Sequence, residues 1–288
     1  MGIDGARRAL TARFAAAQLE TANLDARVLI GHALGLSHSD MIMRAGEPIH
    51  ADILTVIEGY ALRRIGGEPV WQILGYRDFW KRRFKITHDV LTPRPETEGL
   101  VAAALELIKD VSVPRILDLG TGSGAVILSL LGERADAHGF AVDISQAALN
   151  VARENADSFG VECEFYLGAW QAPLNGLAPF DLIVSNPPYI TDAAMGALPR
   201  EVSGFDPDIS LRGGADGLEA YRAIAAGLAA HLKPGGALAL EIGYDQGQSV
   251  VDILRATGMG DICTLKDLSG HDRIVTALRR DDTPQSSG

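Results

Sequence analysis

Two short stretches of this sequence combine residue types that could hold a ligand and position a reacting group. The first, ILDLGTGSGAVILSLL, places glycines at 120, 122 and 124 between an apolar run and a helical pattern. The second, FDLIVSNPPYI, leads an apolar run into residues 186–189, which are an amide, two prolines and a tyrosine. Because residues 186–189 offer no acid, base, thiol or metal ligand, any chemistry there must use a planar, uncharged, hydrogen-bonding pocket.

The glycine loop has the features of a cofactor site. Glycines let the backbone turn sharply and approach a ligand closely, and the following helix offers unpaired N–H groups. Ala125 completes the pattern G-x-G-x-x-G/A, and Asp143 follows roughly twenty residues later at the end of the next apolar run. A carboxylate at that place can accept hydrogen bonds from both hydroxyls of a ribose. These features predict an adenosine-containing cofactor, which could be a nicotinamide dinucleotide or S-adenosylmethionine.

Asp118, just before the loop, bears on that choice. A carboxylate there would repel the phosphates of a dinucleotide, whereas it suits a ligand that carries an ammonium group, such as the methionine part of S-adenosylmethionine. Asp118 could also have a structural role, in which it holds the loop by accepting backbone N–H bonds. The two roles are compatible.

The segment Asn186-Pro187-Pro188-Tyr189 predicts a rigid pocket for a planar NH₂ group. The prolines fix φ and restrict the residue before each of them. The Asn186 side-chain oxygen and a nearby backbone carbonyl can each accept one hydrogen of the NH₂ group, while Tyr189 can stack on its flat face. Methyl transfer to that nitrogen is an in-line displacement that depends chiefly on proximity and orientation, so it requires neither a strong base nor a metal.

These residues must be positioned by an α/β fold. Apolar runs predict strands at 115–120, 138–143, 163–168, 180–185 and 236–242, with a final pair near 262–268 and 272–278. Helical patterns fill most of the gaps, and such alternation predicts a mainly parallel sheet that is covered on both faces. Ligands of these sheets bind at the carboxyl ends of the strands, where the glycine loop, Asp143 and Asn186 fall.

The N-terminal part has a different organisation. Residues 6–64 show helical periodicity, and residues 67–89 alternate around Gly75-Tyr76-Arg77-Asp78 as a β-hairpin would. We therefore expect a helical bundle at 1–70, a hairpin linker at 71–92, a catalytic domain at 93–280 and a disordered tail at 281–288.

Composition excludes several classes of protein. A chain that is 47% hydrophobic and 22% charged is globular, and it has neither an apolar run long enough to span a membrane nor a signal core, so we expect a cytoplasmic protein. Two cysteines in unrelated segments predict buried, reduced thiols and no metal site.

Charge is unevenly divided along the chain. Residues 1–85 carry a net charge of +3 and residues 86–288 a net charge of −14. The acidic part argues against binding to nucleic acid. Five basic residues and four aromatic ones alternate in YRDFWKRRFK (76–85), which is either a partner-binding patch or a solvated strand face.

Further stretches extend the likeness to a known family. A glycine loop followed by NPPY resembles the methyltransferases that modify planar NH₂ groups. The stretches TPRPETEGLV (92–101), EVSGFDPDISLRGGADGLEAYRAI (201–224), LKPGGALALEIGYDQG (232–247) and LSGHDRIV (268–275) make nearly the whole chain similar to the protein-(glutamine-N5) methyltransferases that act on bacterial peptide chain release factors (HemK/PrmC-like).

The resemblance implies a Rossmann-like S-adenosylmethionine-dependent methyltransferase fold with a mainly parallel seven-stranded sheet and a small N-terminal helical domain that recognises the protein substrate. The enzyme would be a monomer that methylates the glutamine of a Gly-Gly-Gln loop and releases S-adenosyl-L-homocysteine. Carried over by motif, the cofactor residues are Gly120, Thr121, Gly122, Ser123, Gly124, Asp143, Trp170 and Asn186, in addition to Asp118. Asn186, Pro187, Pro188 and Tyr189 would bind the glutamine, with Asn186, Pro187 and Tyr189 as the catalytic group. Trp170 has ordinary core packing as its alternative.

Other functions fit parts of the pattern. An adenine-N6 nucleic-acid methyltransferase would use the same NPPY pocket, but such enzymes bind a phosphate backbone through many Lys and Arg contacts, and this catalytic part is acidic. A dinucleotide oxidoreductase and a binding module with a degenerate cofactor loop are further alternatives.

Overall fold

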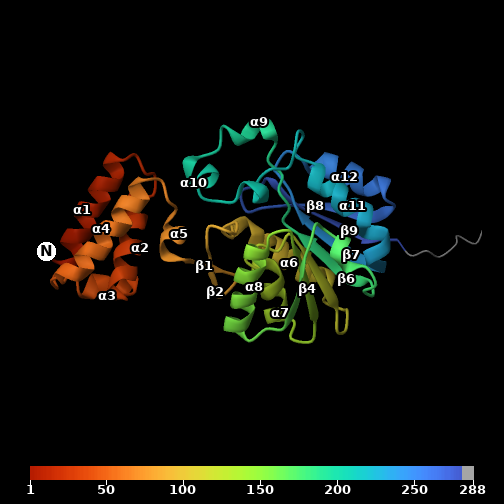
Figure 1. Ribbon diagram of the computed structural model, residues 1–288, viewed down its shortest axis with the longest axis horizontal. Coiled ribbons are helices and arrows are strands. Elements are labelled where there is room, and N and C mark those ends of the chain that lie inside the picture. The colour runs from red at the N-terminus through yellow and green to blue at the C-terminus, as the bar shows by residue number, and fades with distance from the viewer. Residues whose placement is uncertain (281–288) are drawn as a thin grey trace, which may run out of the picture. The chain divides into compact units, whose positions relative to one another are not determined.

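The computed structural model describes residues 1–280 and divides into two compact units (Figure 1). The helical unit comprises Met1–Tyr76 together with Pro199–Phe205. The sheet unit comprises Arg77–Leu198 and Asp206–Gly288, the latter described as far as residue 280. The tail predicted at 281–288 lies outside the described residues.

The helical unit confirms the predicted bundle. Its apolar core includes Phe14 and Leu29, which are fully buried. Its helices are α1 (Ile3–Ala16), α2 (Ala22–Leu34), α3 (His38–Met43), α4 (Ala51–Ile65), α5 (Val70–Leu74) and α10 (Arg200–Ser203).

One arginine ties the late segment of the chain into this unit. Arg64 of α4 is buried and donates a hydrogen bond to Asp25 at 2.7 Å and another to Glu201 at 2.6 Å. The guanidinium is paired on both sides, as a buried charge requires. Residues 199–205 therefore belong to the helical unit, although they follow the NPPY segment in sequence.

The hairpin forms, but not where the sequence suggested. Strands β1 (Tyr76–Phe79) and β2 (Arg82–Lys85) turn at Trp80 and Lys81, which have φ of 42° and 65°. Two-residue turns with positive φ suit the twist of a hairpin, but Asn-Gly is their usual signal and Trp-Lys gives none. Gly75 instead ends α5 in the left-handed conformation.

Apart from Tyr76, the hairpin belongs to the sheet unit. Phe79 and Phe84 are buried in the same cluster as residues of the sheet. Lys81 pairs with Glu133, and Lys85 pairs with Glu154. Since the aromatic rings form core and these charges have intramolecular partners, residues 76–85 fit the solvated strand face better than the partner-binding patch.

The seven-stranded sheet confirms the predicted fold class. Its order is β5-β4-β3-β6-β7-β9-β8; the first five are parallel, and β9 is antiparallel to both β7 and β8. The bounds are β3 (Arg115–Leu119), β4 (His138–Asp143), β5 (Cys163–Leu167), β6 (Phe180–Ser185), β7 (Leu232–Glu241), β8 (Met259–Lys266) and β9 (Asp272–Arg279).

Helices cover both faces of this sheet, because its strands are apolar on both sides (Figure 1). One face packs against α6 (Glu98–Leu107), α7 (Ala125–Glu133) and α8 (Gln146–Phe159). The other packs against α11 (Glu219–His231) and α12 (Gly247–Ala256). Short elements complete the unit: η1 (Pro95–Thr97), η2 (Ala172–Leu174), α9 (Asp192–Met195) and η3 (Asp208–Ser210).

Two further expectations can be compared with the structure. Both cysteines are free, as expected, but Cys163 is only half-buried and Cys263 is exposed, because it lies on an exposed stretch of the outermost strand. Within residues 1–280, no helix is long and apolar enough to cross a membrane.

Candidate active site

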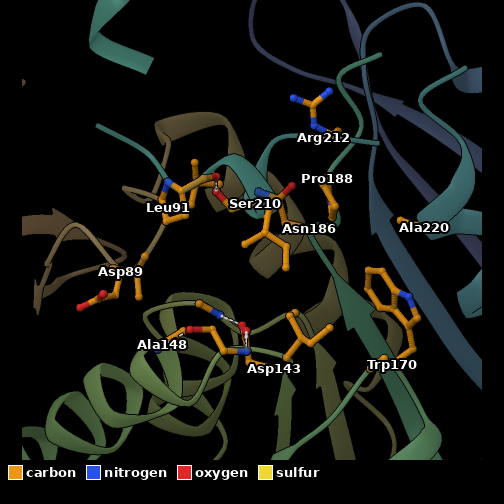
Figure 2. A pocket seen from close by; sticks show the side chains of 18 of the residues that line it. Asp89, Leu91, Asp143, Ala148, Trp170, Asn186, Pro188, Ser210, Arg212 and Ala220 are labelled. Atoms are coloured by element: carbon orange, nitrogen blue, oxygen red, sulfur yellow. Dashed lines mark hydrogen bonds between the residues drawn. The ribbon is translucent and has the colours of Figure 1, made fainter. Parts of the chain in front are cut away.

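A cavity of about 450 Å³ lies in the sheet unit, at the carboxyl ends of the strands (Figure 2). Its position agrees with the rule for ligand sites in parallel sheets. Of the residues predicted from sequence, Gly120, Gly122, Asp143, Trp170, Asn186 and Pro188 line it. The other lining residues include Asp89, Leu91, Ile144, Ile209, Ser210, Arg212 and Glu219.

The glycine loop is held against the end of β4. The N–H groups of Gly120 and Thr121 donate to the Val142 carbonyl at 2.8 and 3.0 Å. Gly120 and Gly122 have φ of 73° and 55°, a region that side-chain-bearing residues rarely adopt. The loop thus turns directly into α7 with its backbone next to the cavity.

Asp143 connects the loop to the next helix. Its carboxylate accepts hydrogen bonds from the N–H of Gly122 at 2.8 Å and of Ser145 at 2.9 Å, drawn as dashed lines in Figure 2. Burial raises the pKa of Asp143, and the backbone N–H bonds oppose that shift. Ser145, not Asp143, caps α8, by accepting from the Ala148 N–H. Asp143 therefore lies at the cavity wall, and its contact with a cofactor stays a prediction.

Asp118 lies beneath the loop and does not line the cavity. Its side chain is almost wholly buried and accepts a hydrogen bond of 2.7 Å from the Thr121 hydroxyl. Burial raises the pKa of Asp118 to about 7, although the Thr121 bond opposes this. This geometry favours the structural role for Asp118, and a contact with the cofactor stays a prediction. Thr121, Ser123 and Gly124 likewise do not line the cavity.

Asn155, which sequence reasoning missed, supports the loop from behind. It is buried and donates to the carbonyls of Ser123 at 2.9 Å and Lys85 at 3.1 Å, while accepting from the Lys85 N–H at 2.7 Å. A single amide thus joins the glycine loop to the hairpin. In the sequence of α8, Asn155 looks like an ordinary polar residue, so no local pattern indicated its role in supporting the loop.

Trp170 stands on the cavity wall opposite the side where Asp89 lies (Figure 2). A Cβ added to Gly120 would lie 3.8 Å from the Trp170 ring, so the ring lies beside the start of the glycine loop. The ring also packs on the apolar cluster beneath α11 and α12. The two interpretations of Trp170, site residue and core residue, are therefore both consistent with its position.

Asn186 follows β6, the strand next to β3, and this adjacency brings it to the same edge as the glycine loop. Its Nδ2 donates to the Thr97 hydroxyl at 3.2 Å. Asn186 and Pro188 line the cavity, whereas Pro187 and Tyr189 do not. Thr97 was not predicted, since 89 residues separate it from Asn186 and only the fold brings the two together.

Tyr189 is held by its backbone. The Gln246 side chain donates to the carbonyls of Tyr189 at 3.0 Å and Gly217 at 3.1 Å, and it accepts from the Gly243 N–H at 3.0 Å. A Cβ at Gly217 would approach the Tyr189 carbonyl oxygen to 2.5 Å, so this close packing requires glycine there. Gln246 is thus a second supporting residue that the sequence did not reveal.

Arg212 brings charge to the cavity rim. It forms ion pairs with Asp192 at 2.6 Å and with Asp208 at 3.0 Å. All three side chains are largely exposed to solvent. Nearby, the Gly213 N–H donates a hydrogen bond of 2.8 Å to the Ile190 carbonyl, which fixes the segment after NPPY. Among residues 1–280, no group of His, Cys, Asp and Glu could hold a metal ion.

Comparisons with known proteins match both parts of the chain. The sequence model of the PrmC N-terminal domain matches residues 5–75, and that of a methyltransferase domain matches residues 111–248. In solved structures, the hMettl16 catalytic domain in complex with the MAT2A 3'UTR hairpin 6 has a TM-score of 0.56 at 15% identity, covering 69% of this chain and 76% of its own. The Thermus thermophilus 16S rRNA N2 G1207 methyltransferase has a TM-score of 0.52 at 22% identity, covering 71% and 50%. These two show the fold.

Sequence relatives are much closer. A release factor glutamine methyltransferase of Cereibacter sphaeroides is 45% identical, over 94% of this chain and 96% of its own length. One from Bradyrhizobium diazoefficiens is 44% identical over 96% and 95%, and one from Rhodospirillum rubrum is 44% identical over 93% and 82%. With this identity over nearly the whole length, the chain belongs to the family of release factor glutamine methyltransferases.

Proposed function

We propose that this enzyme transfers a methyl group from S-adenosylmethionine to the side-chain amide nitrogen, N5, of the glutamine in the Gly-Gly-Gln motif of peptide chain release factors. The observation that carries the proposal is that one cavity is lined by the glycine loop, the Asp143 carboxylate and the Asn186 amide. Membership of the family supports the release factor as the substrate class.

The cavity fits the cofactor. A volume of about 450 Å³ lies within the usual range of pockets for ligands of this size, roughly 300–1,000 Å³. Asp143 supplies acceptors for ribose hydroxyls, and the exposed Ile144 beside it offers an apolar surface for a base. S-adenosylmethionine supplies the chemistry, a methyl group on a positively charged sulfur.

The chain itself binds and orients the amide. The Asn186 Oδ1 and a nearby backbone carbonyl accept the two hydrogens of the substrate NH₂, which directs the nitrogen lone pair out of the hydrogen-bonded plane. Accepting both hydrogens also stabilises positive charge that develops on the nitrogen in the transition state. Pro187 and Pro188 keep these acceptors fixed, so little reorganisation accompanies the reaction.

Glutamine is favoured over adenine on electrostatic grounds. Residues 86–288, which contain the cavity, carry 28 Asp and Glu against 14 Lys and Arg. A phosphate backbone would meet repulsion at such a surface, whereas a protein loop would not.

The proposal is tested by methylation of the intact release factor and by one substitution in the enzyme. Purified enzyme, intact release factor and S-adenosylmethionine labelled in its methyl group are expected to give one labelled glutamine, located by peptide mass spectrometry. A release factor with alanine for that glutamine should stay unlabelled. Asn186→Ala should lower turnover by roughly a hundredfold while keeping much of the cofactor affinity, since it deletes an acceptor for the reacting group. Label elsewhere on the factor, or full turnover by Asn186→Ala, would contradict the proposal.

A further inference from the structure

A buried carboxylate connects two segments of the chain beside the cavity. Asp206 is 7% exposed; it accepts a hydrogen bond from the Arg94 Nη2 at 2.5 Å and one from the Thr92 N–H at 3.3 Å. None of these three residues lines the cavity. The Arg94 side chain is 41% exposed, so the ion pair reaches solvent only at its cationic end. We call these two contacts of Asp206 the Asp206 anchor.

The segments that the anchor joins both border the cavity. Residues 89–91, directly before Thr92, line it. So do four residues after Asp206, which are Pro207, Ile209, Ser210 and Arg212. We call the segment 207–213 the outer wall of the cavity. Figure 2 shows Leu91 and Ser210 on the side of the cavity that faces Asp143 and Ala148. A ligand bound next to Asp143 would therefore lie against the outer wall.

The outer wall is attached at its other end as well. The Ile190 N–H donates to the Leu211 carbonyl at 2.9 Å, and the Gly213 N–H donates to the Ile190 carbonyl at 2.8 Å. Between the two ends lies the single turn η3. The outer wall is thus a short span with two attachments. The Asp206 anchor is one of them, and its loss would leave the span attached at one end.

Prolines restrict the backbone on both sides of the anchor. Pro93 and Pro95 flank Arg94, and Pro207 follows Asp206. A residue before proline is held mainly in the extended region, so Arg94 and Asp206 have few alternative backbone conformations. The two partners are therefore presented to each other by stiff segments.

The place of Asp206 in the chain gives the anchor a purpose. Pro199–Phe205, directly before it, belong to the helical unit, and Asp206 begins the next part of the sheet unit. A displacement of residues 199–205 would pass along the chain into the outer wall if nothing held the chain between them. Asp206 is the residue at which the chain is held.

The chemistry of the pair favours a positioning role over a stabilising one. Burial raises the pKa of Asp206, and the Arg94 charge opposes the rise. The cost of removing a carboxylate from water largely offsets its attraction to a cation, so a buried ion pair adds little net stability. Its directed hydrogen bonds nevertheless specify one arrangement of the groups that they join. The Asp206 anchor thus specifies where the outer wall lies.

We propose that Asp206 and Arg94 are positioning residues for the cofactor, because the anchor between them holds the outer wall against bound S-adenosylmethionine. The proposal rests on the function proposed above, since it takes S-adenosylmethionine as the ligand. Neither residue lines the cavity, so both act through the outer wall.

The first test compares two carboxylates with the same kinds of partner. Asp206→Asn keeps the size of the side chain and can still accept the Thr92 N–H, but it removes the charge that pairs with Arg94. The control is Asp181→Asn. Asp181 accepts from a backbone N–H and from a lysine, both at 2.8 Å, and it lies near the start of β6, away from the carboxyl ends of the strands.

We expect Asp206→Asn to weaken S-adenosylmethionine binding by about tenfold in calorimetric titration, as for a wall that is in place about a tenth of the time. In steady-state kinetics, the KM for the cofactor should rise by more than kcat falls, since the reacting pocket keeps its own supports. Asp181→Asn should change affinity by no more than about twofold. Unchanged affinity in Asp206→Asn, or an equal loss in Asp181→Asn, would overturn the proposal.

The second test starts from the exposed partner, where substitution disturbs the fold least. Arg94→Met removes the charge, and Arg94→Lys keeps it. Affinity should fall by about tenfold in Arg94→Met and by no more than about threefold in Arg94→Lys, because a single hydrogen bond to the carboxylate does not require the guanidinium fork. Combining Asp206→Asn with Arg94→Met should give no larger loss than either alone, since both remove one contact. Additive losses would contradict a shared role.

A third measurement needs no ligand. Four backbone N–H groups of the outer wall are hydrogen-bonded, those of Ser210, Leu211, Arg212 and Gly213. Their exchange with solvent deuterium reports how often the wall opens. In the ligand-free enzyme, peptides covering 207–213 should exchange about tenfold faster in Asp206→Asn than in the wild type, and at the wild-type rate in Asp181→Asn.

This measurement separates the two proposals. If release factor is methylated but exchange of the outer wall is the same in Asp206→Asn as in the wild type, the anchor is wrong and the proposed function stands. If release factor is not methylated but exchange follows Asp206, the proposed function fails and the attachment of the outer wall stands.

Discussion

At the scale of single residues, the proposed function gives the Asp143 carboxylate two tasks, loop support and ribose binding. Of its roughly four acceptor positions, the Gly122 and Ser145 N–H groups occupy two, which leaves acceptors for ribose hydroxyls. Under the proposed function, loop support and cofactor binding therefore depend on the same group. A substitution there should disturb the cofactor more than the fold, because the sheet core lies elsewhere.

Asp143→Ala is expected to weaken cofactor binding at least about tenfold, since hydrogen bonds to a charged acceptor contribute roughly 1.5–3 kcal/mol each. Calorimetric titration with S-adenosylmethionine measures the change, and circular dichroism checks that the fold is kept. The same titration with nicotinamide dinucleotide should give no heat of binding. Unchanged affinity in a folded variant would remove Asp143 from the site.

Asp118 should make stability depend on pH. Its pKa is raised from 3.8 to about 7 by burial, so the folded protein keeps a proton that the unfolded chain releases above pH about 4. The folded state is therefore favoured by this group at low pH, and that contribution is lost as the pH rises from about 4 to about 7.

Asp118→Asn tests this sign. Asparagine can still accept the Thr121 hydroxyl but carries no charge, so the stability of the variant relative to the wild type should increase from pH 5 to pH 8, and the variant should be the more stable protein at pH 8. A difference of about 1 kcal/mol corresponds to roughly 2–4 °C in Tm for a unit of this size. Thermal unfolding at both pH values measures it, and a wild type that is the more stable protein at pH 8 would refute the assignment.

At the scale of elements, one glutamine joins three segments. Gln246, at the start of α12, bonds to the backbone of Tyr189, Gly217 and Gly243. Its loss leaves buried backbone groups without partners, each of which costs about 1–3 kcal/mol. Gln246→Ala should therefore lower the Tm and also reduce kcat, because the NPPY segment loses its support.

The matched control for Gln246 is Gln248→Ala. Gln248 lies on the same helix but is exposed and bonds only to Asp252 among the described residues. The Tm from thermal unfolding and the single-turnover rate should fall in Gln246→Ala and stay unchanged in Gln248→Ala. If Gln246→Ala behaves like Gln248→Ala in both measurements, the support argument is wrong.

The sequence predicts the sheet elements well and their polar supports poorly. Strands such as 115–119 and 180–185 were predictable because apolar runs and turn residues are local signals. The Trp80-Lys81 turn was not, since its residues lack the usual signal for positive φ. Asn155, Gln246 and Thr97 were missed for another reason: each acts on groups that are distant in sequence, and nothing in its neighbours records that contact.

At the scale of the whole molecule, the proposed function requires that the enzyme select one glutamine of one protein. A pocket that accepts an amide cannot by itself tell one protein from another, so specificity must come from remote contacts. We expect the helical unit to make these contacts, because it exposes apolar side chains. Ile42 and Met43 of α3, for example, are 63% and 76% exposed. Residues 76–85 are poorer candidates, since their rings are largely core and their charges are paired.

Deleting residues 1–70 would not test this cleanly. Pro199–Phe205 belongs to the helical unit, and Glu201 pairs with Arg64, so a truncated chain would leave that segment without its partners. Surface substitutions on α3 avoid the problem, because exposed side chains contribute little to the fold.

The final prediction therefore compares substrates and surfaces together. Energy gained from contacts far from the glutamine orients the Gly-Gly-Gln loop, so an isolated peptide should have a kcat/KM at least about a hundredfold below that of the intact factor. The double substitution Ile42→Ser and Met43→Ser should lower kcat/KM for the intact factor by about tenfold or more and leave the peptide unchanged. Leu268→Ser, at an exposed position of the sheet unit, is the matched control and should leave both unchanged.

Adenine-containing DNA should not be methylated. If DNA is methylated, or if the α3 variant treats intact factor as the wild type does, recognition through the helical unit is wrong.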